Sequence, residues 1–263
     1  MPFIAIDAGN TYIVIGVLNE KKILFSSRLK TDRFKTSDEY AVILYELFRI
    51  HGIDGSRLEG GIISSVVPSL KQVLREAVHK ITGRQSMIVG PGLKNGLKIQ
   101  IDNPAQLGSD LVAEAIAAAA EYDGPVLIFD MSTATTVSVV GRGGKYLGGM
   151  IIPGLIVSLE ALYSQTAQLP HVSLAEGPRG VVGTNTNDCI ANGVIYGNAA
   201  MIDGIAERLS EELGEQPHLI ATGDACDLIT PYCRQKIRTV KELLLKGLRI
   251  IYMKNRRPES AGE

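Results

Sequence analysis

The sequence has few of the residues that mark specialised classes of protein. It contains no tryptophan, three cysteines and four histidines among 263 residues. The cysteines, Cys189, Cys226 and Cys233, lack the CxxC spacing of metal and redox sites, and such an odd, scattered set is typical of reduced thiols in the cytoplasm. The histidines are isolated and show no metal-ligand spacing. The sequence therefore predicts no metal centre or reactive thiol built from these residue types.

Excess charge and long apolar runs are also lacking. The net charge is −1 and the pI is about 6.5, so there is no electrostatic footprint for nucleic acid or an anionic membrane. No apolar run approaches the roughly 18–20 residues that span a bilayer, and the first residues indicate a strand rather than a signal peptide. A chain that is 45% hydrophobic can bury one large core or two ordinary ones. We expect a folded cytoplasmic protein.

What the sequence does contain is an alternation of strands and helices. Buried or hairpin strands are predicted at 3–7, 12–18, 22–28, 61–66, 125–130, 134–140, 145–151 and 218–222. Helices are predicted at 37–51, 69–82 and 104–122 from apolar spacing, capping residues and alanine content. This order is typical of an α/β protein.

One strand–turn pattern occurs twice. FIAIDAGNT and VLIFDMSTATT each run from an apolar strand into an aspartate, Asp7 or Asp130, then a turn with threonine and a hairpin. The repeat favours a duplicated α/β fold, with a chance resemblance of two segments as the alternative. Because ligands of α/β sheets bind outside the carboxyl ends of strands, we expect both acids to face one cleft.

A third segment, HLIATGDACDLI at 218–229, runs from a strand through Thr222–Gly223 towards a helix. Such turns direct backbone N–H groups at an anion or a purine edge. Three turns can divide one nucleotide, with the first two holding phosphates and the last holding adenosine. GRGGK at 141–145 lacks the spacing of a P-loop and predicts a hairpin turn.

These turns resemble those of the sugar kinase, Hsp70 and actin ATPase superfamily. More narrowly, the chain resembles the type III pantothenate kinases nearly end to end. The segments that carry this resemblance, in family order, are DAGNT, TSDEY, SSVVPSL, NPAQLGSD, GGMIIPG, SLEAL, TAQLP, GTNT and LKGLRIIY. The resemblance implies a duplicated RNase-H-like fold with halves at 1–118 and 119–263, each a mixed five-stranded sheet flanked by helices.

The resemblance also implies an activity and its site. The activity is ATP-dependent phosphorylation of pantothenate, the first step of coenzyme A biosynthesis, by a homodimer that uses Mg²⁺ and potassium or ammonium. Asp110 would be the general base, Asp7 would hold Mg²⁺ through water, and Asp130 would bind the monovalent cation. Nucleotide contacts fall on Ala8, Gly9, Asn10, Thr11, Thr133, Thr222 and Gly223. Substrate contacts fall on Ile101, Gly108, Ser109, Asp110, Leu111 and, across the dimer interface, Thr186. Without the resemblance, the alternative is that Asp7 and Asp130 cap turns and that Asp110 is an acid in the first turn of a helix, where the helix dipole favours it.

Four positions depart from the family pattern. Ser132 and Asp224 replace glycines around the nucleotide, Leu111 replaces an arginine, and Ile101 replaces a tyrosine. The last two face pantothenate in the family, where its carboxylate needs a cationic or hydrogen-bonding partner. Two alternatives therefore remain beside pantothenate kinase: a kinase for a less acidic alcohol, and a catalytically weakened regulatory or ligand-sensing paralogue.

Overall fold

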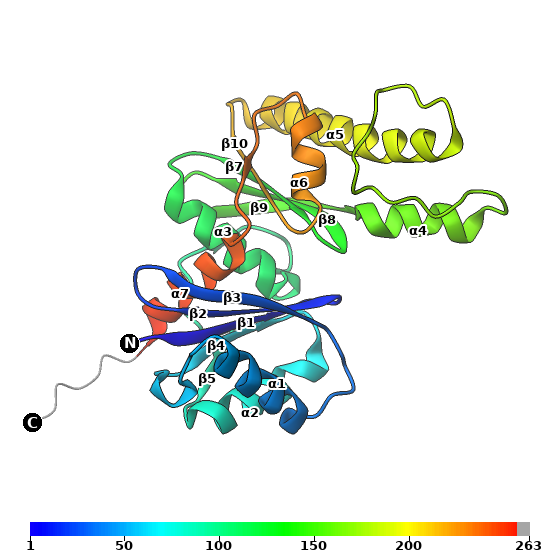
Figure 1. Cartoon of the computed structure of the whole chain (residues 1–263). Helices are drawn as coiled ribbons and strands as arrows, with labels where there is room; N and C mark the ends of the chain where they lie inside the picture. Colours follow the sequence, from blue (N-terminus) through cyan, green and yellow to red (C-terminus); the bar gives the residue numbers. More distant parts are fainter. Residues whose placement is uncertain (257–263) are drawn as a thin grey trace, which may run out of the picture. The chain divides into compact units, whose positions relative to one another are not determined.

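The computed structural model describes residues 1–256, which divide into two compact units (Figure 1). Unit 1 comprises residues 1–97, 102–117 and the segment that begins at Leu243, and unit 2 comprises residues 98–101 and 118–242. The predicted halves at 1–118 and 119–263 differ from these units mainly at residues 98–101 and at the C-terminus. Helix α7 (Leu243–Asn255) belongs to unit 1 because it packs on strands of that unit.

The sheet of unit 1 has five strands, as predicted. Their order is β3 (Ile23–Lys30), β2 (Tyr12–Leu18), β1 (Phe3–Ala8), β4 (Gly61–Ser65) and β5 (Ser86–Ile88). The first three strands form the predicted antiparallel hairpins, whereas β1, β4 and β5 run parallel. Because β1 and β4 are parallel neighbours, their carboxyl ends meet at one edge, where Asp7 pairs in register with Ser64.

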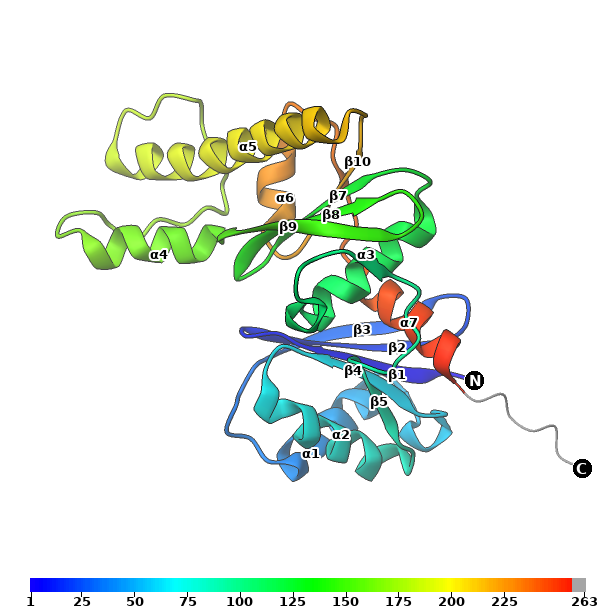
Figure 2. The same ribbon diagram turned by 180° about the vertical axis from the view of Figure 1, so that it is seen from behind.

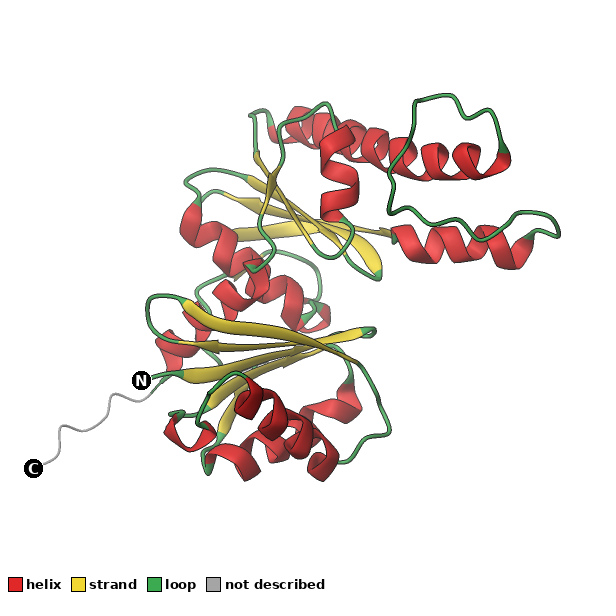
Figure 3. Ribbon diagram, viewed as in Figure 1, coloured by secondary structure: helices red, strands yellow, loops and turns green. Residues whose placement is uncertain are grey.

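One face of this sheet is covered by two helices, α1 (Ser37–Ile50) and α2 (Pro68–Thr82) (Figure 3). Leu44 of α1 and Leu74 of α2 are buried in one cluster with Ile6 and Ile15 of the strands. Helix α2 begins at Pro68, a residue favoured in the first turn because proline lacks the N–H that would have no helical partner there.

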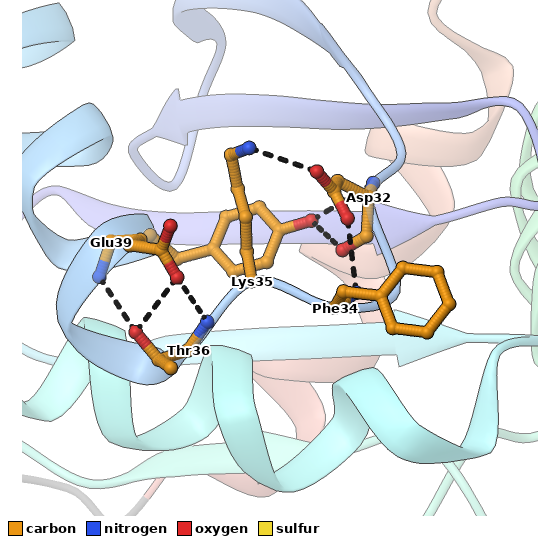
Figure 4. Close-up of polar contacts among 6 residues, drawn as sticks. Asp32, Phe34, Lys35, Thr36 and Glu39 are labelled. Carbon is orange, nitrogen blue, oxygen red and sulfur yellow. Dashed lines mark hydrogen bonds and ion pairs between the residues drawn. The ribbon is translucent and has the colours of Figure 1, made fainter.

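The loop that precedes α1 is fixed by its own polar contacts (Figure 4). The Thr36 hydroxyl accepts from the Glu39 N–H at 3.3 Å, and the Glu39 carboxylate accepts from the Thr36 N–H at 2.8 Å, which completes a capping box. The buried Tyr40 donates its hydroxyl to the Asp32 carbonyl at 2.7 Å, and Lys35 pairs with the Asp32 carboxylate at 2.9 Å. The conformation of residues 31–36 is therefore set before any ligand binds.

Helix α7 and the part of α3 (Ser109–Glu121) up to residue 117 complete unit 1. Figure 2 shows α7 on the face of the sheet opposite α1 and α2, where the rings of Tyr252 and Phe3 stack with centroids 3.9 Å apart. Gly247 of α7 lies so close to α3 that a Cβ there would collide with the Ala113 carbonyl. This close packing fixes the N-terminal part of α3, which carries Asp110.

Helix α3 begins later than the predicted 104–122. Residues Pro104–Gln106 form a separate 3₁₀ turn, in which the Asn103 side chain accepts from the Ala105 N–H at 3.2 Å. The α-helix starts only at Ser109, immediately after Gly108. Asp110 is therefore in the first turn of α3.

The sheet of unit 2 has six strands, one more than predicted. Their order is β11 (Arg238–Thr239), β10 (His218–Thr222), β7 (Val126–Met131), β8 (Ala134–Gly141), β9 (Lys145–Pro153) and β6 (Lys98–Ile99). The predicted strand positions do not include either edge strand, β6, which pairs with β9, or β11, which pairs with β10. Each has only two residues and is too short to give a sequence signal. The GRGGK segment forms the predicted β8–β9 hairpin turn, with Gly143 and Gly144 at positive φ.

Three helices, α4 (Leu155–Gln165), α5 (Thr186–Leu213) and α6 (Cys226–Ile229), accompany this sheet. Ile195 and Ile202 of α5 lie in one buried cluster with Phe129 and Val137 of the strands. Figures 1 and 2 both show α4 beside the N-terminal part of α5. Across the described part of the chain, every helix is too short or too polar to span a membrane.

Candidate active site

The first acid, Asp7, lies at the carboxyl end of β1 and is 7% exposed. Its Oδ1 accepts a hydrogen bond from the hydroxyl of Ser64 at 2.6 Å, and Ser64 is completely buried on the neighbouring strand. The Ser64 and Ser109 hydroxyl oxygens lie 2.9 Å apart, and Ser109 Oγ also accepts from the Ser65 N–H at 3.2 Å. Unit 1 therefore brings Asp7 and the start of α3 into one hydrogen-bonded group.

The turn that follows Asp7 is held from the β3–α1 loop. Gly9 N–H donates to the Tyr12 carbonyl at 2.9 Å, which closes the turn. Thr31 donates its hydroxyl to the Gly9 carbonyl at 2.7 Å, and Arg33 donates to Asn10 Oδ1 at 2.9 Å. The predicted phosphate turn is thus a preformed structure with a guanidinium beside it, and sequence reasoning did not identify Arg33.

Asp110 is a partly buried carboxylate in the first turn of α3. Its Oδ1 accepts from the Leu111 N–H at 2.9 Å, and Gly108 leaves room for it, because a Cβ at 108 would collide with this oxygen. Burial raises the pKa of Asp110, since desolvation disfavours the charged form more than the backbone hydrogen bonds favour it. A carboxylate with a raised pKa is suited to accept a proton.

The second acid, Asp130, lies near the carboxyl end of β7. Its Oδ1 accepts from the Ser132 hydroxyl at 2.6 Å. Thr222, at the end of the parallel strand β10, pairs in register with Asp130, and Gly223 follows with a φ of +86°. A Cβ at Gly223 would collide with Asp130 Oδ1 and the Met131 backbone. Unit 2 therefore brings the second predicted phosphate turn and the predicted adenosine turn together.

The Ser132–Thr133 turn also packs against the start of α4. A Cβ at Gly154 would collide with the carbonyl oxygens of both residues. Ser132 has an ordinary negative φ, because no non-glycine residue within 1–256 has a positive one. Serine therefore fits this turn without backbone strain, and its side chain is used to hydrogen-bond Asp130.

The remaining predicted contacts are spread over both units. Leu111 is half-buried next to Asp110 in unit 1. Ile101 is half-buried after β6, and Thr186 is exposed at the first residue of α5, both in unit 2. Asp224 is exposed after Gly223. The helix predicted after this turn is α6, which has only four residues.

Two of the three cysteines, Cys226 and Cys233, are at least partly buried. Burial raises the pKa of Cys226 to about 11 and that of Cys233 to about 12, so both thiols stay protonated at neutral pH. Three of the histidines, His51, His171 and His218, pack against aromatic rings. Within residues 1–256, no group of three or more His, Cys, Asp or Glu side chains could hold a metal ion.

Sequence reasoning missed the serines that support the acids. Ser64 lies in SSVVPSL, which was used above for a strand and for its place in the family order, and Ser132 was noted only as a replacement for glycine near the nucleotide. A serine at the end of a buried strand, in register with an acid on a parallel neighbour, is the signal that could have found Ser64.

Comparison with known proteins identifies the family. A family model described as type III pantothenate kinase matches residues 3–208. The type III pantothenate kinase of Moorella thermoacetica is 39% identical over 252 residues, which are 96% of this chain and 99% of that protein. The enzyme of the same name from Geotalea daltonii is 40% identical over 253 residues, which are 96% of this chain and 98% of that protein.

Solved structures agree on the fold. A protein titled as a putative Baf family transcriptional activator from Campylobacter jejuni has a TM-score of 0.59 at 20% identity, over 96% of this chain and 98% of that one. A putative N-acetylmannosamine kinase from Listeria monocytogenes has a TM-score of 0.53 at 11% identity, over 98% of this chain and all of that one. These likenesses confirm the predicted actin-like ATPase fold class. Matched along nearly all of its length by relatives at about 40% identity, the chain belongs to the type III pantothenate kinase family.

Proposed function

We propose that this protein transfers the γ-phosphoryl group of ATP to the primary hydroxyl of pantothenate, giving 4′-phosphopantothenate and ADP in the cytoplasm. In this reaction the bond between the γ-phosphorus and the bridging oxygen of ATP breaks, a new phosphorus–oxygen bond forms to the alcohol, and the alcohol proton leaves. Membership of the family over nearly the whole chain carries the proposal. The retention of Asp7, Asp110 and Asp130 supports it further.

Asp110 is the proposed general base. Its raised pKa, its partial burial and the glycine that makes room for its carboxylate support this role. The proton of the alcohol passes to Asp110 as the oxygen attacks phosphorus, and it then leaves to solvent. Phosphoryl transfer otherwise depends on positioning and charge stabilisation, which is the proposed task of the two turns.

The first turn would hold the phosphates of MgATP. The backbone of Ala8 and Gly9, the Asn10 side chain and the Thr11 hydroxyl are the proposed contacts, and Asp7 would hold Mg²⁺ through water. Carboxylate and hydroxyl oxygens suit this hard cation, and the donor set around Asp7 consists of such oxygens. Bound Mg²⁺ would supply positive charge to the phosphates.

The second turn would hold the remaining parts of the nucleotide. Asp130 is the proposed ligand of potassium or ammonium, Thr133 is the proposed phosphate contact, and Thr222–Gly223 would receive adenosine. The carboxylate oxygens of Asp130 have the chemistry that such a cation needs, although Ser132 already donates to one of them. Gly223 is needed for the close approach of this turn to Asp130, because a Cβ there would collide with Asp130 Oδ1.

The proposed pantothenate contacts are Gly108 and Leu111 beside the base, together with Ile101. Thr186 of a partner subunit would complete the pocket in a homodimer. Unit 2 has exposed apolar side chains that suit such an interface: Met150, Ile151, Ile156, Val157, Leu162, Val181 and Val182. Ile151 is 80% exposed and Val182 is 83% exposed, which is unusual for branched apolar residues that stay in water.

The test is ADP release by the purified protein with pantothenate, pantetheine and related primary alcohols, together with identification of the phosphorylated product by mass spectrometry. We expect turnover of pantothenate that requires Mg²⁺ and is lost in Asp110→Asn. Turnover of pantetheine alone would identify a kinase for the uncharged alcohol. ATP binding without turnover of any alcohol would contradict the kinase and favour the regulatory alternative.

A further inference from the structure

Ser64 lies at the centre of a group of hydrogen bonds that links Asp7 to the start of α3. Ser64 has one hydroxyl proton, and Asp7, as a carboxylate, can only accept. The 2.6 Å bond to Asp7 therefore uses the proton of Ser64. Ser64 Oγ also donates to Ser109 Oγ at 2.9 Å, so its single proton is shared between Asp7 and Ser109. Ser109 in turn accepts from the Ser65 N–H.

This group of hydrogen bonds joins three elements at one place. Asp7 is the penultimate residue of β1, Ser64 and Ser65 end β4, and Ser109 begins α3 directly before Asp110. Ser65 is itself held, because its Oγ accepts from the Val67 N–H at 3.0 Å. Since Ser64 is 0% exposed, water cannot replace a lost partner there without a rearrangement of the sheet.

We propose that Ser64 and Ser109 are positioning residues that set the location of Asp110 relative to Asp7. The proposal rests on the kinase function and on Asp110 as its base. Ser109 Oγ accepts from both the Ser64 hydroxyl and the Ser65 N–H, so it ties the first turn of α3 to the end of β4. A misplacement of a base by a fraction of an ångström lowers the rate of the chemical step while substrate binding changes little.

The matched variants at position 109 are Ser109→Thr, which keeps the hydroxyl, and Ser109→Val, which has nearly the same shape without it. We expect kcat of Ser109→Val to be about 10–100-fold below that of Ser109→Thr, the range for a hydrogen bond in a charged chain. The KM for ATP should be the same in both. Ser64→Ala should lower kcat and also raise the KM for ATP, because it removes the donor to Asp7.

A double variant and a control complete the experiment. The kcat of the double variant Ser64→Ala with Ser109→Val should be at most about twofold below that of the slower single variant. Both substitutions interrupt the same group of hydrogen bonds, so their effects should not add. The control is Ser86→Ala on the adjacent strand β5, a buried serine whose hydroxyl has no hydrogen-bond partner within residues 1–256, and its kcat should equal that of the wild type.

The outcomes separate this proposal from the kinase function. Equal kcat in Ser109→Thr and Ser109→Val, with an active wild type, would overturn the positioning role and leave the kinase intact. Equal loss in Ser86→Ala would also overturn it, because any buried serine would then matter. A wild type that binds ATP but phosphorylates no alcohol would overturn both. Circular dichroism of each variant verifies that the fold is retained.

Discussion

Ser132 Oγ donates a 2.6 Å hydrogen bond to Asp130 Oδ1, so one carboxylate oxygen of the second acid already accepts from a hydroxyl in its own turn. Asp7 accepts a bond of the same length from Ser64. Both acids are thus hydrogen-bonded to a serine, but Ser64 lies on the adjacent strand, whereas Ser132 lies two residues from its acid. Ser132 is the one that departs from the family pattern, and its bond competes directly with any cation at that oxygen.

Removal of this serine should strengthen cation binding. In Ser132→Gly the oxygen of Asp130 loses its donor, and we expect the half-saturating potassium concentration to fall about 3–10-fold, the range for an ordinary hydrogen bond of about 0.5–1.5 kcal/mol. Steady-state kinetics in a potassium titration at constant ionic strength measures this. Ser132→Ala should act in the same direction, because it also removes the hydroxyl. No change in either variant would show that the serine does not compete with the cation.

Asp110→Asn should lower kcat by about 10²–10⁴-fold, because it keeps the shape of the side chain but removes the proton acceptor. ATP affinity, measured by calorimetry, should stay within about twofold. The matched control is Asp38→Asn, which changes another acid in the first turn of a helix, one that pairs with Lys80. If both variants lose the same small amount of activity, Asp110 is only a helix-terminus acid.

The raised pKa of Asp110 predicts two pH dependences. As a base it must be deprotonated, so the acidic limb of kcat should lie above the ordinary aspartate value of 3.8. The folded protein binds this proton more tightly than the unfolded chain, so Asp110 costs stability as pH rises from 3.8 to its raised pKa. Asp110→Asn should therefore melt at a higher temperature than wild type at neutral pH, and this difference should shrink in acid. A difference that is constant with pH would contradict the raised pKa.

The substitutions Leu111→Arg and Ile101→Tyr should together improve pantothenate use. A charge-assisted hydrogen bond contributes roughly 1.5–3 kcal/mol, which is about one to two orders of magnitude in affinity. We expect wild type to have a high KM for pantothenate and the double variant to raise kcat/KM at least tenfold. Pantetheine, which lacks the carboxylate, is the control substrate and should be unaffected. Saturation of wild type at micromolar pantothenate would show that another residue binds the carboxylate.

Charge on the apolar surface of unit 2 should prevent dimer formation. Ile151→Glu combined with Val182→Glu places two carboxylates where we propose an interface, so sedimentation at micromolar concentration should shift from dimer to monomer. Activity should fall with it if Thr186 acts on the partner's substrate. Ile50→Glu changes an equally exposed apolar residue of unit 1 and should leave the dimer intact. A wild-type monomer at the same concentration would contradict the interface.

The order of elements could be predicted because each depends on local chemistry. Apolar runs ending in aspartate gave the strands that end near Asp7 and Asp130, and Pro68 and Thr36 gave the starts of two helices within one residue. Glycine positions gave the GRGGK hairpin. The order of the family motifs alone led to the family. These features involve residues close in sequence, so no tertiary contact was needed to find them.

The tertiary structure alone decided what surrounds the acids. Asp7 meets Ser64 across 57 residues of sequence, and Ser64 meets Ser109 across 45, because parallel strands and a helix start converge at one edge. The assignment of α7 to unit 1 follows in the same way from Gly247, whose lack of a side chain admits the Ala113 carbonyl. Sequence determines which segments form and which residues can carry charge. The partners of those residues depend on long-range packing, for which neither propensity nor spacing gives a signal.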